Sequence, residues 1–384
     1  MHHNNTTLQF RHIKFILWAG LIFAVFFLCS GCRAIFIPVD QIRALSSRKA
    51  YQSVPANIRV ANFSQIGYGH IQAINPKQSV LLVTNASTVP PVAYTVNLLN
   101  PQNGSNQNFI TSDKQATATV FQGDGKGVYY LNAQNTASNG SHRYQLVWSS
   151  LNRALTKALS LPGESVQPAL CATDETHLLY ADQSGHLIVI DSHQNRRVFN
   201  LPLPLIISKI YCIPQTHQLF FLGQKKNDDI PTFYTTVLKN YPRAKRQPLK
   251  LQIIDHKVTD FDWMNQDHRL VYLRTMDCQR QIKTYSLKTL QIKKITTGYF
   301  YRITALKRDA VIVSQGHGST FSNAATLQYI DLNTKQQKQL TSPLRLSSSV
   351  FSHQKKKSST LFFSVEIPDK SNRGNEAIYR IDLK

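Results

Sequence analysis

The chain has 384 residues, of which 44 are basic and 21 are acidic, and its formal net charge is +23. Aromatic residues at 10% and apolar residues at 42% exclude a largely disordered protein. The length fits two or three average domains or one large all-β domain. The positive charge favours anionic partners such as lipid headgroups, glycans or acidic proteins, although a generally basic proteome would produce the same excess.

The N-terminus has the three parts of a secretory signal. Residues 1–14 are polar and basic without an acid, and residues 15–28 form an unbroken apolar run. Small residues and a cysteine follow, in the order Cys29-Ser30-Gly31-Cys32. Two cations, Arg11 and Lys14, belong to this leader, so the rest of the chain carries +21.

This stretch resembles the signals of bacterial lipoproteins, which end in Leu, two small residues and a lipidated Cys. Ser30, Gly31 and Cys32 match that ending, whereas Cys29 stands where Leu is commoner. The resemblance implies cleavage after residue 31 and acylation of Cys32, and Arg33 favours an outer membrane facing the periplasm. Residues 15–32 also offer 18 uncharged positions, so an uncleaved inner-membrane anchor and simple secretion are the alternatives.

Residues 32–56 are predicted to be a lipidated tether, because Pro38 and Pro55 punctuate them and no periodicity runs through them. Residues 57–384 contain a repeated unit, in which a short apolar strand and a polar turn precede a strongly apolar strand. The starts of the strongly apolar strand are 41 to 51 residues apart, which is the period of four-stranded propeller blades. These starts are Val80, Val128, Leu178, Leu219, Leu270, Val311 and Leu361.

A third, alternating strand follows in every copy, and a fourth, polar strand fits five copies. The seventh copy ends at Lys384 directly after its third strand, while a spare strand-like run, Ile58–Phe63, precedes the first copy. The ring closes if the spare strand completes the last blade, which leaves only short, protected edges. The sequence therefore predicts an all-β propeller of about seven four-stranded blades, closed by an N-terminal strand.

Ile330–Thr334 followed by Gln339–Thr341 resembles the third-to-fourth-strand signature of TolB-like (PD40-type) propeller repeats. Tyr379–Leu383 and Tyr285–Thr289 are weaker matches. TolB itself has six blades, so the resemblance concerns the repeat type. It implies a periplasmic scaffold that binds proteins through one face of the propeller.

No catalytic or cofactor motif is present: the chain lacks G-x-S-x-G, H-E-x-x-H, a P-loop and a dinucleotide glycine pattern. We therefore expect no cofactor, no metal and no catalytic residue. Cys171 and Cys212 occupy similar places in adjacent copies, where two buried thiols or a disulfide would fit. The leading hypothesis is a non-enzymatic, lipid-anchored scaffold for an envelope protein; the alternative is a propeller enzyme or carbohydrate-binding module acting on anionic envelope polymers.

Two groups of residues are candidates for binding. The first lies where first strands begin, near the expected channel, and is rich in residue types that are frequent in interfaces. It consists of Tyr68, His70, Tyr299, Tyr301 and Arg302. The second group is basic and suits anionic lipid or glycan, although it is equally typical of a solvated surface; an exported address disfavours nucleic acid. It consists of Arg243, Lys245, Arg246, Lys355, Lys356 and Lys357.

Overall fold

The computed structural model describes residues 58–384, except for short gaps at 76, 78–79, 87–93, 113–115, 134–143, 153–154, 239–245, 307–308, 317–323, 355–357 and 368–375. Cys32, with the predicted signal and tether, lies outside the described residues. Five residues of the predicted basic group also lie outside them, namely Arg243, Lys245, Lys355, Lys356 and Lys357. No helix in the described part of the chain is long and apolar enough to cross a membrane.

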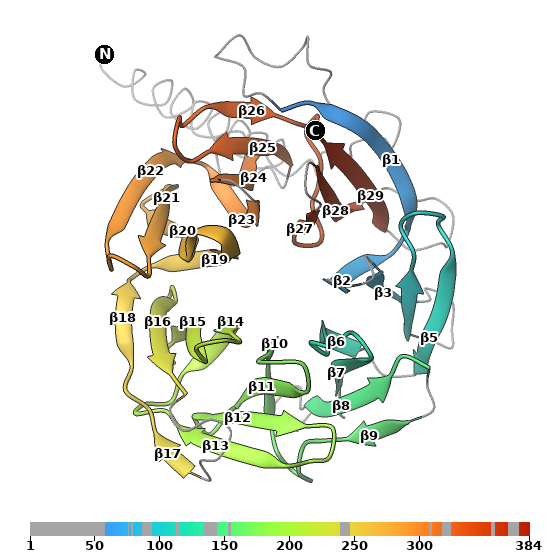
Figure 1. Cartoon of the computed structure of the whole chain (residues 1–384), viewed down its shortest axis with the longest axis vertical. Helices are drawn as coiled ribbons and strands as arrows, with labels where there is room; N and C mark the ends of the chain where they lie inside the picture. Colours follow the sequence, from blue (N-terminus) through green and yellow to red (C-terminus); the bar gives the residue numbers. More distant parts are fainter. Residues whose placement is uncertain are drawn as a thin grey trace, which may run out of the picture.

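Seven antiparallel blades surround a central channel (Figure 1), as the repeat predicted. In blades one to six the strands run in chain order from the channel outward. Blade one is β2 (His70–Ile74), β3 (Leu81–Ala86), β4 (Tyr94–Leu99) and β5 (Asn106–Ser112); blade two is β6 (Ala116–Phe121), β7 (Gly127–Ala133), β8 (Tyr144–Ser150) and β9 (Thr156–Ala158); blade three is β10 (Val166–Ala172), β11 (His177–Asp182), β12 (His186–Asp191) and β13 (Arg196–Asn200).

The remaining blades follow the same plan. Blade four is β14 (Ile206–Ile213), β15 (Gln218–Gln224), β16 (Thr232–Val237) and β18 (Gln252–Asp255); blade five is β19 (Val258–Met264), β20 (Arg269–Met276), β21 (Gln279–Ser286) and β22 (Ile292–Gly298); blade six is β23 (Phe300–Leu306), β24 (Ala310–Gly316), β25 (Ala325–Asp331) and β26 (Gln337–Gln339); blade seven is β27 (Phe351–Gln354), β28 (Ser359–Glu366), β29 (Glu376–Leu383) and β1 (Val60–Tyr68).

The second strand of each blade forms the core, which explains its strongly apolar sequence. In β20 the four residues Leu270–Leu273 are completely buried, because neighbouring blades cover both faces of the strand. Aromatic rings join blades four and five: the ring centroids of Phe233 and Phe261 lie 4.7 Å apart, and those of Phe233 and Tyr272 lie 5.5 Å apart. Such aromatic packing between blades helps to hold the ring together.

The predicted closure of the ring is confirmed. β1 pairs antiparallel with β29, from Val60 opposite Leu383 to Tyr68 opposite Ala377, so the spare N-terminal strand completes blade seven. The ring of Phe63 stacks on Tyr379, with centroids 5.3 Å apart. The strand is longer than the predicted Ile58–Phe63, since it continues to Tyr68.

Blade three contains a fifth strand that the repeat did not predict. β17 (Arg246–Pro248) pairs in parallel with β13, although it belongs to the connection between the third and fourth strands of blade four. This pairing covers part of the exposed edge of blade three. It also places Arg246 of the predicted basic group at the outer rim, far from the channel (Figure 1).

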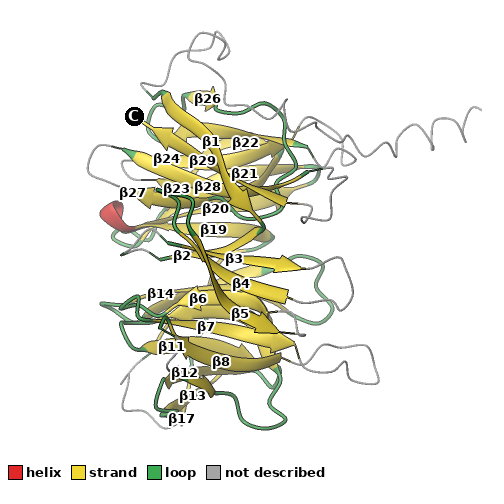
Figure 2. Cartoon of the chain, turned by 90° about the vertical axis from the view of Figure 1, so that its right-hand side faces the viewer, coloured by secondary structure: helices red, strands yellow, loops and turns green. Residues whose placement is uncertain are grey.

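The two faces of the ring differ in what they contain. The innermost strands begin at one face, which we call the inlet face, and end at the other, which we call the turn face. The turn face contains the 3-10 turn η2 (Asn265–Asp267) and the C-terminus (Figure 2). It also contains the start of the folded domain, because the backbones of Arg59 and Lys384 hydrogen-bond to each other.

Blades seven and one are joined by the hydroxyl of Ser364, which is completely buried. Its Oγ donates to the carbonyl oxygen of Gly69 and accepts from the backbone N–H of Ile71, both at 2.9 Å. We expect Ser364→Ala to lower the free energy of unfolding by about 2–4 kcal/mol, because two buried backbone groups lose their partner. Chemical denaturation followed by tryptophan fluorescence measures this change.

The control is Ser347→Ala in the strand connection beside it. The Ser347 hydroxyl is buried and has no hydrogen-bond partner among the described residues, so its removal should be neutral or slightly stabilising. Equal losses in the two variants would contradict the role given to Ser364.

Candidate functional site

The innermost strands share a backbone irregularity that shapes the channel. Six of them, β2, β6, β10, β14, β19 and β23, contain a register shift near their start at the inlet face. Such bulges bend a strand and redirect a side chain. In consecutive blades the residue directly after the shift is Lys209, Asp260 and Arg302, so a repeated backbone feature brings three charged residues to one level of the channel.

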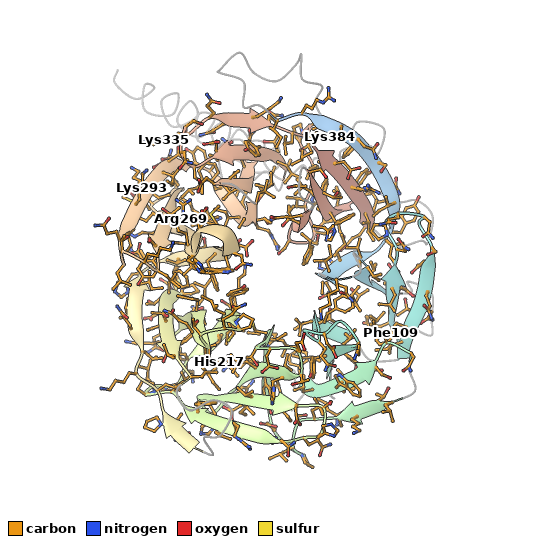
Figure 3. All side chains as sticks on the ribbon, viewed as in Figure 1. Phe109, His217, Arg269, Lys293, Lys335 and Lys384 are labelled. Atoms are coloured by element: carbon orange, nitrogen blue, oxygen red, sulfur yellow. The ribbon has the colours of Figure 1, made fainter. Side chains whose placement is uncertain are left out.

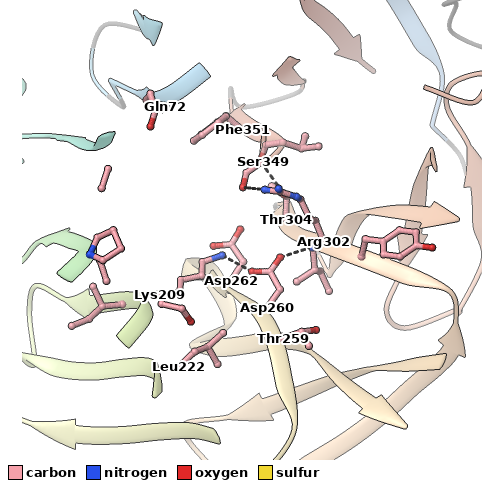
Figure 4. A pocket seen from close by; sticks show the side chains of 18 of the residues that line it. Gln72, Lys209, Leu222, Thr259, Asp260, Asp262, Arg302, Thr304, Ser349 and Phe351 are labelled. Atoms are coloured by element: carbon pink, nitrogen blue, oxygen red, sulfur yellow. Dashed lines mark hydrogen bonds and ion pairs between the residues drawn. The ribbon is translucent and has the colours of Figure 1, made fainter. Parts of the chain in front are cut away.

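The channel contains a cavity of about 740 Å3, to which all seven blades contribute. Its walls differ in charge. Blades four, five and six supply every charged residue of the lining, namely Lys209, Asp260, Asp262, Arg280 and Arg302. Blades seven, one, two and three supply only uncharged residues, such as Gln72, Thr119 and Phe351 (Figure 4). A ligand in this cavity would therefore meet charge on one side and neutral surface on the other.

Lys209 and Asp260 form the central ion pair of the charged wall, with Nζ 2.7 Å from Oδ1. The same carboxylate accepts hydrogen bonds from the backbone N–H groups of Phe261 and Ile303, each at 2.9 Å, so it joins blades four, five and six. Burial lowers the pKa of Lys209, but the nearby carboxylates outweigh this effect, and its pKa is raised overall. The ammonium group therefore remains charged. The side chain is 41% exposed, so part of it is accessible from the channel.

Asp262 is the second carboxylate of the charged wall. It accepts hydrogen bonds from the backbone N–H groups of Trp263 and Ala305, both at 2.8 Å. Burial raises its pKa above the usual range, against the opposing effects of Lys209 and of the two N–H groups. Both acids of the cavity are thus engaged by backbone amides, which link blade five to blade six.

Arg302 is the exposed cation of the charged wall. One guanidinium nitrogen donates to the hydroxyl of Ser349 at 2.8 Å, which orients the group from blade six toward blade seven (Figure 4). Its charge opposes the protonation of Lys209, so the two cations lie close enough to interact. No acid pairs with Arg302 among the described residues, which leaves its remaining donors available to a ligand.

Tyr301 provides an aromatic surface beside Arg302 and is 38% exposed. The guanidinium of Arg280 lies 5.4 Å from the centre of its ring and donates to the carbonyl oxygen of Phe300 at 2.6 Å. On the other side, a Cβ atom added to Gly316 would lie 2.4 Å from the ring, so glycine is needed there. These contacts hold the ring in a fixed position at the cavity wall.

The structure brings together only part of the predicted binding group. Tyr301 and Arg302 line the cavity, but Tyr68, His70 and Tyr299 are not among its lining residues. Tyr68 ends the outermost strand of blade seven, and His70 Nδ1 lies 3.0 Å from the Glu376 carboxylate. Whether these residues bind a partner stays a prediction.

Sequence reasoning did not identify Lys209, Asp260 or Asp262. The signal that could have found them is a charged residue inside an otherwise apolar first strand, at matching positions of neighbouring repeats. The described residues contain no group of three or more His, Cys, Asp or Glu side chains that could hold a metal ion.

Cys171 and Cys212 are free, buried thiols rather than a disulfide. The backbone N–H of Cys212 donates to the Cys171 sulfur at 3.2 Å, so the pair connects blades three and four. Burial raises the pKa of the Cys171 thiol to about 12, and it raises that of Cys212 as well. Neither thiol is therefore a reactive nucleophile.

Comparison with known proteins supports the architecture. An oligogalacturonate lyase in complex with manganese is similar, with a TM-score of 0.59, 12% identity, and coverage of 92% of this chain and 98% of the other. The fold is a seven-bladed β-propeller. A nidogen/laminin complex matches with a TM-score of 0.43 and 12% identity, over 67% of this chain and 91% of the other. No protein-family model and no curated protein matches the chain.

At such low identity the likeness concerns the fold alone, because one propeller architecture serves unrelated functions. The narrower resemblance to TolB-like repeats stays a prediction, and the charged wall must be interpreted from its own chemistry.

Lys209→Met tests the electrostatics of this wall. The substitution leaves two carboxylates without their cation, and we expect it to lower the free energy of unfolding by about 1–2 kcal/mol near pH 7. This loss of stability should be smaller near pH 4. The pKa of Asp262 is raised in the folded state, so the carboxylate becomes protonated as the pH falls, and its unfavourable negative charge is then removed. Urea denaturation at the two pH values measures this.

Lys126→Met is the control, since Lys126 lies 4.0 Å from Asp124 and its side chain is 85% exposed. We expect no change at either pH. A Lys209→Met loss that does not depend on pH would contradict the assignment.

Proposed function

We propose that this protein is a lipid-anchored scaffold of the bacterial envelope, whose propeller binds an acidic group of a partner protein in the channel at the inlet face. The observation that carries the proposal is Arg302, an exposed cation of the charged wall that pairs with no acid among the described residues and lies near a second cation, Lys209. Asp260 and Asp262 already accept hydrogen bonds from backbone N–H groups. The wall therefore offers a ligand mainly hydrogen-bond donors. Three cations against two carboxylates leave an excess of positive charge.

A carboxylate is the simplest group that satisfies this wall. Arg302 can form charge-assisted hydrogen bonds to it, and Tyr301 offers an aromatic surface for the carbon atoms that bear it. The opposite wall is neutral, so it accommodates the remainder of an acidic side chain without repelling it. The cavity is open to solvent rather than filled by core side chains, which suits an inserted side chain or chain end.

The membrane address rests on the leader. An apolar run followed by Ser30-Gly31-Cys32 supports a lipid anchor at Cys32, and Arg33 supports an outer membrane facing the periplasm. A lipid anchor would hold the propeller at the membrane while the tether leaves it free to meet partners.

Cys32→Ser tests this address. We expect the wild-type chain to be shortened by cleavage after residue 31 and to gain the mass of acyl chains, while the variant lacks both changes. Intact mass spectrometry and fractionation of inner and outer membranes measure the two properties. An unprocessed, membrane-bound chain in both cases would replace the lipid anchor with an uncleaved signal anchor.

The alternative function is an enzyme acting on anionic envelope polymers. The observation that favours it is Asp262, a carboxyl whose pKa is raised by burial inside a cavity, which is how proton-transferring acids are prepared. The fold is compatible with catalysis, since a lyase shares it. Shortening of an anionic glycan by the wild-type protein, absent with Asp262→Asn, would establish the enzyme and overturn the scaffold.

Arg302→Gln tests the binding site itself. We expect it to weaken the binding of a short glutamate peptide to the full chain about tenfold or more, because a charge-assisted hydrogen bond is lost. Calorimetry in detergent measures the affinity. Arg59→Gln is the control, since Arg59 is exposed on the turn face, and it should leave the affinity unchanged. Equal effects of the two substitutions would show that the peptide senses only the general positive charge.

A further inference from the structure

The most exposed large apolar side chain of the described residues is Leu290, at 64%, and it lies on the turn face rather than in the channel. It belongs to the turn between β21 and β22, and Ile292 at the start of β22 is also exposed, at 43%. A leucine at such a place is unfavourable both for its contact with water and for its backbone, which adopts a positive φ of 56°.

Two other blades have the same turn wholly within the described residues, which allows a comparison within the chain. In each, the first residue of a six-residue turn donates its backbone N–H to the last: Asn100 to Ser105, Ser286 to Gln291, and Asp331 to Gln336. The fifth position has a positive φ every time. It is occupied by Gly104 in blade one and by Lys335 in blade six, both of which suit an exposed turn, but by Leu290 in blade five. The turn geometry does not require leucine.

Lysines surround the two exposed apolar residues. Lys288, Lys293 and Lys294 are all exposed, and none forms an ion pair among the described residues. Figure 3 shows Lys293 at the outer edge of blade five. The acids on neighbouring turns have a cation of their own, since Asp267 and Asp309 share Arg269 as their partner. The backbone of Leu287 hydrogen-bonds to His268, which fixes this turn beside those acids.

We propose that the segment Lys288–Lys294 inserts into an anionic membrane surface, with Leu290 and Ile292 entering the interface and the three lysines contacting lipid phosphates. This site is separate from the channel, and the inference does not rest on the acidic ligand proposed there. A protruding turn with apolar residues between unpaired lysines matches the chemistry of an anionic bilayer surface. An acidic chain such as poly-glutamate would account for the lysines but offers no apolar interior for Leu290 and Ile292 to enter.

The position of this turn agrees with such an orientation. The chain enters the folded domain at Arg59 on the turn face, so residues 1–57, which include the proposed anchor, connect to the same face. Contact of this face with the membrane leaves the inlet face, and therefore the channel opening, directed away from the bilayer. One surface would then hold the propeller while the other remains accessible.

The test places an environment-sensitive fluorescent amino acid at position 290 of the full chain, reconstituted in phosphatidylglycerol or phosphatidylcholine vesicles. We expect a blue shift of its emission and quenching by spin-labelled lipid in the anionic vesicles only. The matched control is the same amino acid at position 161, because Leu161 is 57% exposed but has no such lysine cluster, and it should stay in water. A label at position 290 that is as exposed to water as that at position 161 would overturn the proposal.

Charge variants supply the second arm. Combining Lys288→Gln, Lys293→Gln and Lys294→Gln should weaken the membrane contact about a hundredfold, at about fivefold for each lysine, and salt at about 1 M should have a similar effect. Lys225→Gln with Lys226→Gln, an exposed pair in blade four, and Arg302→Gln in the channel should leave the contact unchanged. A shift produced in detergent by poly-glutamate but not by vesicles would also overturn the proposal, in favour of an acidic polypeptide.

Discussion

The pairing of β1 with β29 is the constraint on which the rest of the structure depends. Without it blade seven would present a bare edge to solvent, and the ring would have two ends. The pairing also determines where the cavity lies, because a closed ring holds seven innermost strands at a fixed distance around one axis. The Ser364 hydroxyl supports the same junction from inside, where it joins blade seven to the beginning of blade one.

Closure alone would make a symmetric channel, and the residues after the bulges remove that symmetry. Lys209, Asp260 and Arg302 come at equivalent positions of three consecutive blades, whereas the other four blades supply uncharged residues to the lining. The acids stabilise the contact of blade five with blade six through backbone N–H groups, so their role is structural before any ligand arrives. Arg302 is a cation of this wall without an acidic partner among the described residues, and the proposal of an acidic ligand rests on it.

The two faces of the ring differ in their chemistry. The inlet face opens on the charged wall, while the turn face combines the entry of the chain at Arg59 with the exposed Leu290 and its lysines. Glycine and lysine occupy the position of Leu290 in two equivalent turns, so the turn conformation does not require a leucine there. The two proposed binding surfaces therefore lie on opposite faces, and their chemistry is different: fixed donors in a cavity on one face, and exposed apolar residues among unpaired lysines on the other.

The sequence by itself determined the number of blades, their period and the closure by an N-terminal strand, because burial of each second strand on both faces leaves a strong local pattern of apolar residues. It also indicated Tyr301 and Arg302. Only the tertiary structure decided that Lys209, Asp260 and Asp262 join them, since the contacts link three separate strands, over 51 positions from Lys209 to Asp260 and 43 from Asp260 to Ile303, and depend on ring geometry. The fifth strand of blade three was equally invisible, because a parallel pairing between segments of two blades depends on how the blades are placed in space, which no local pattern records.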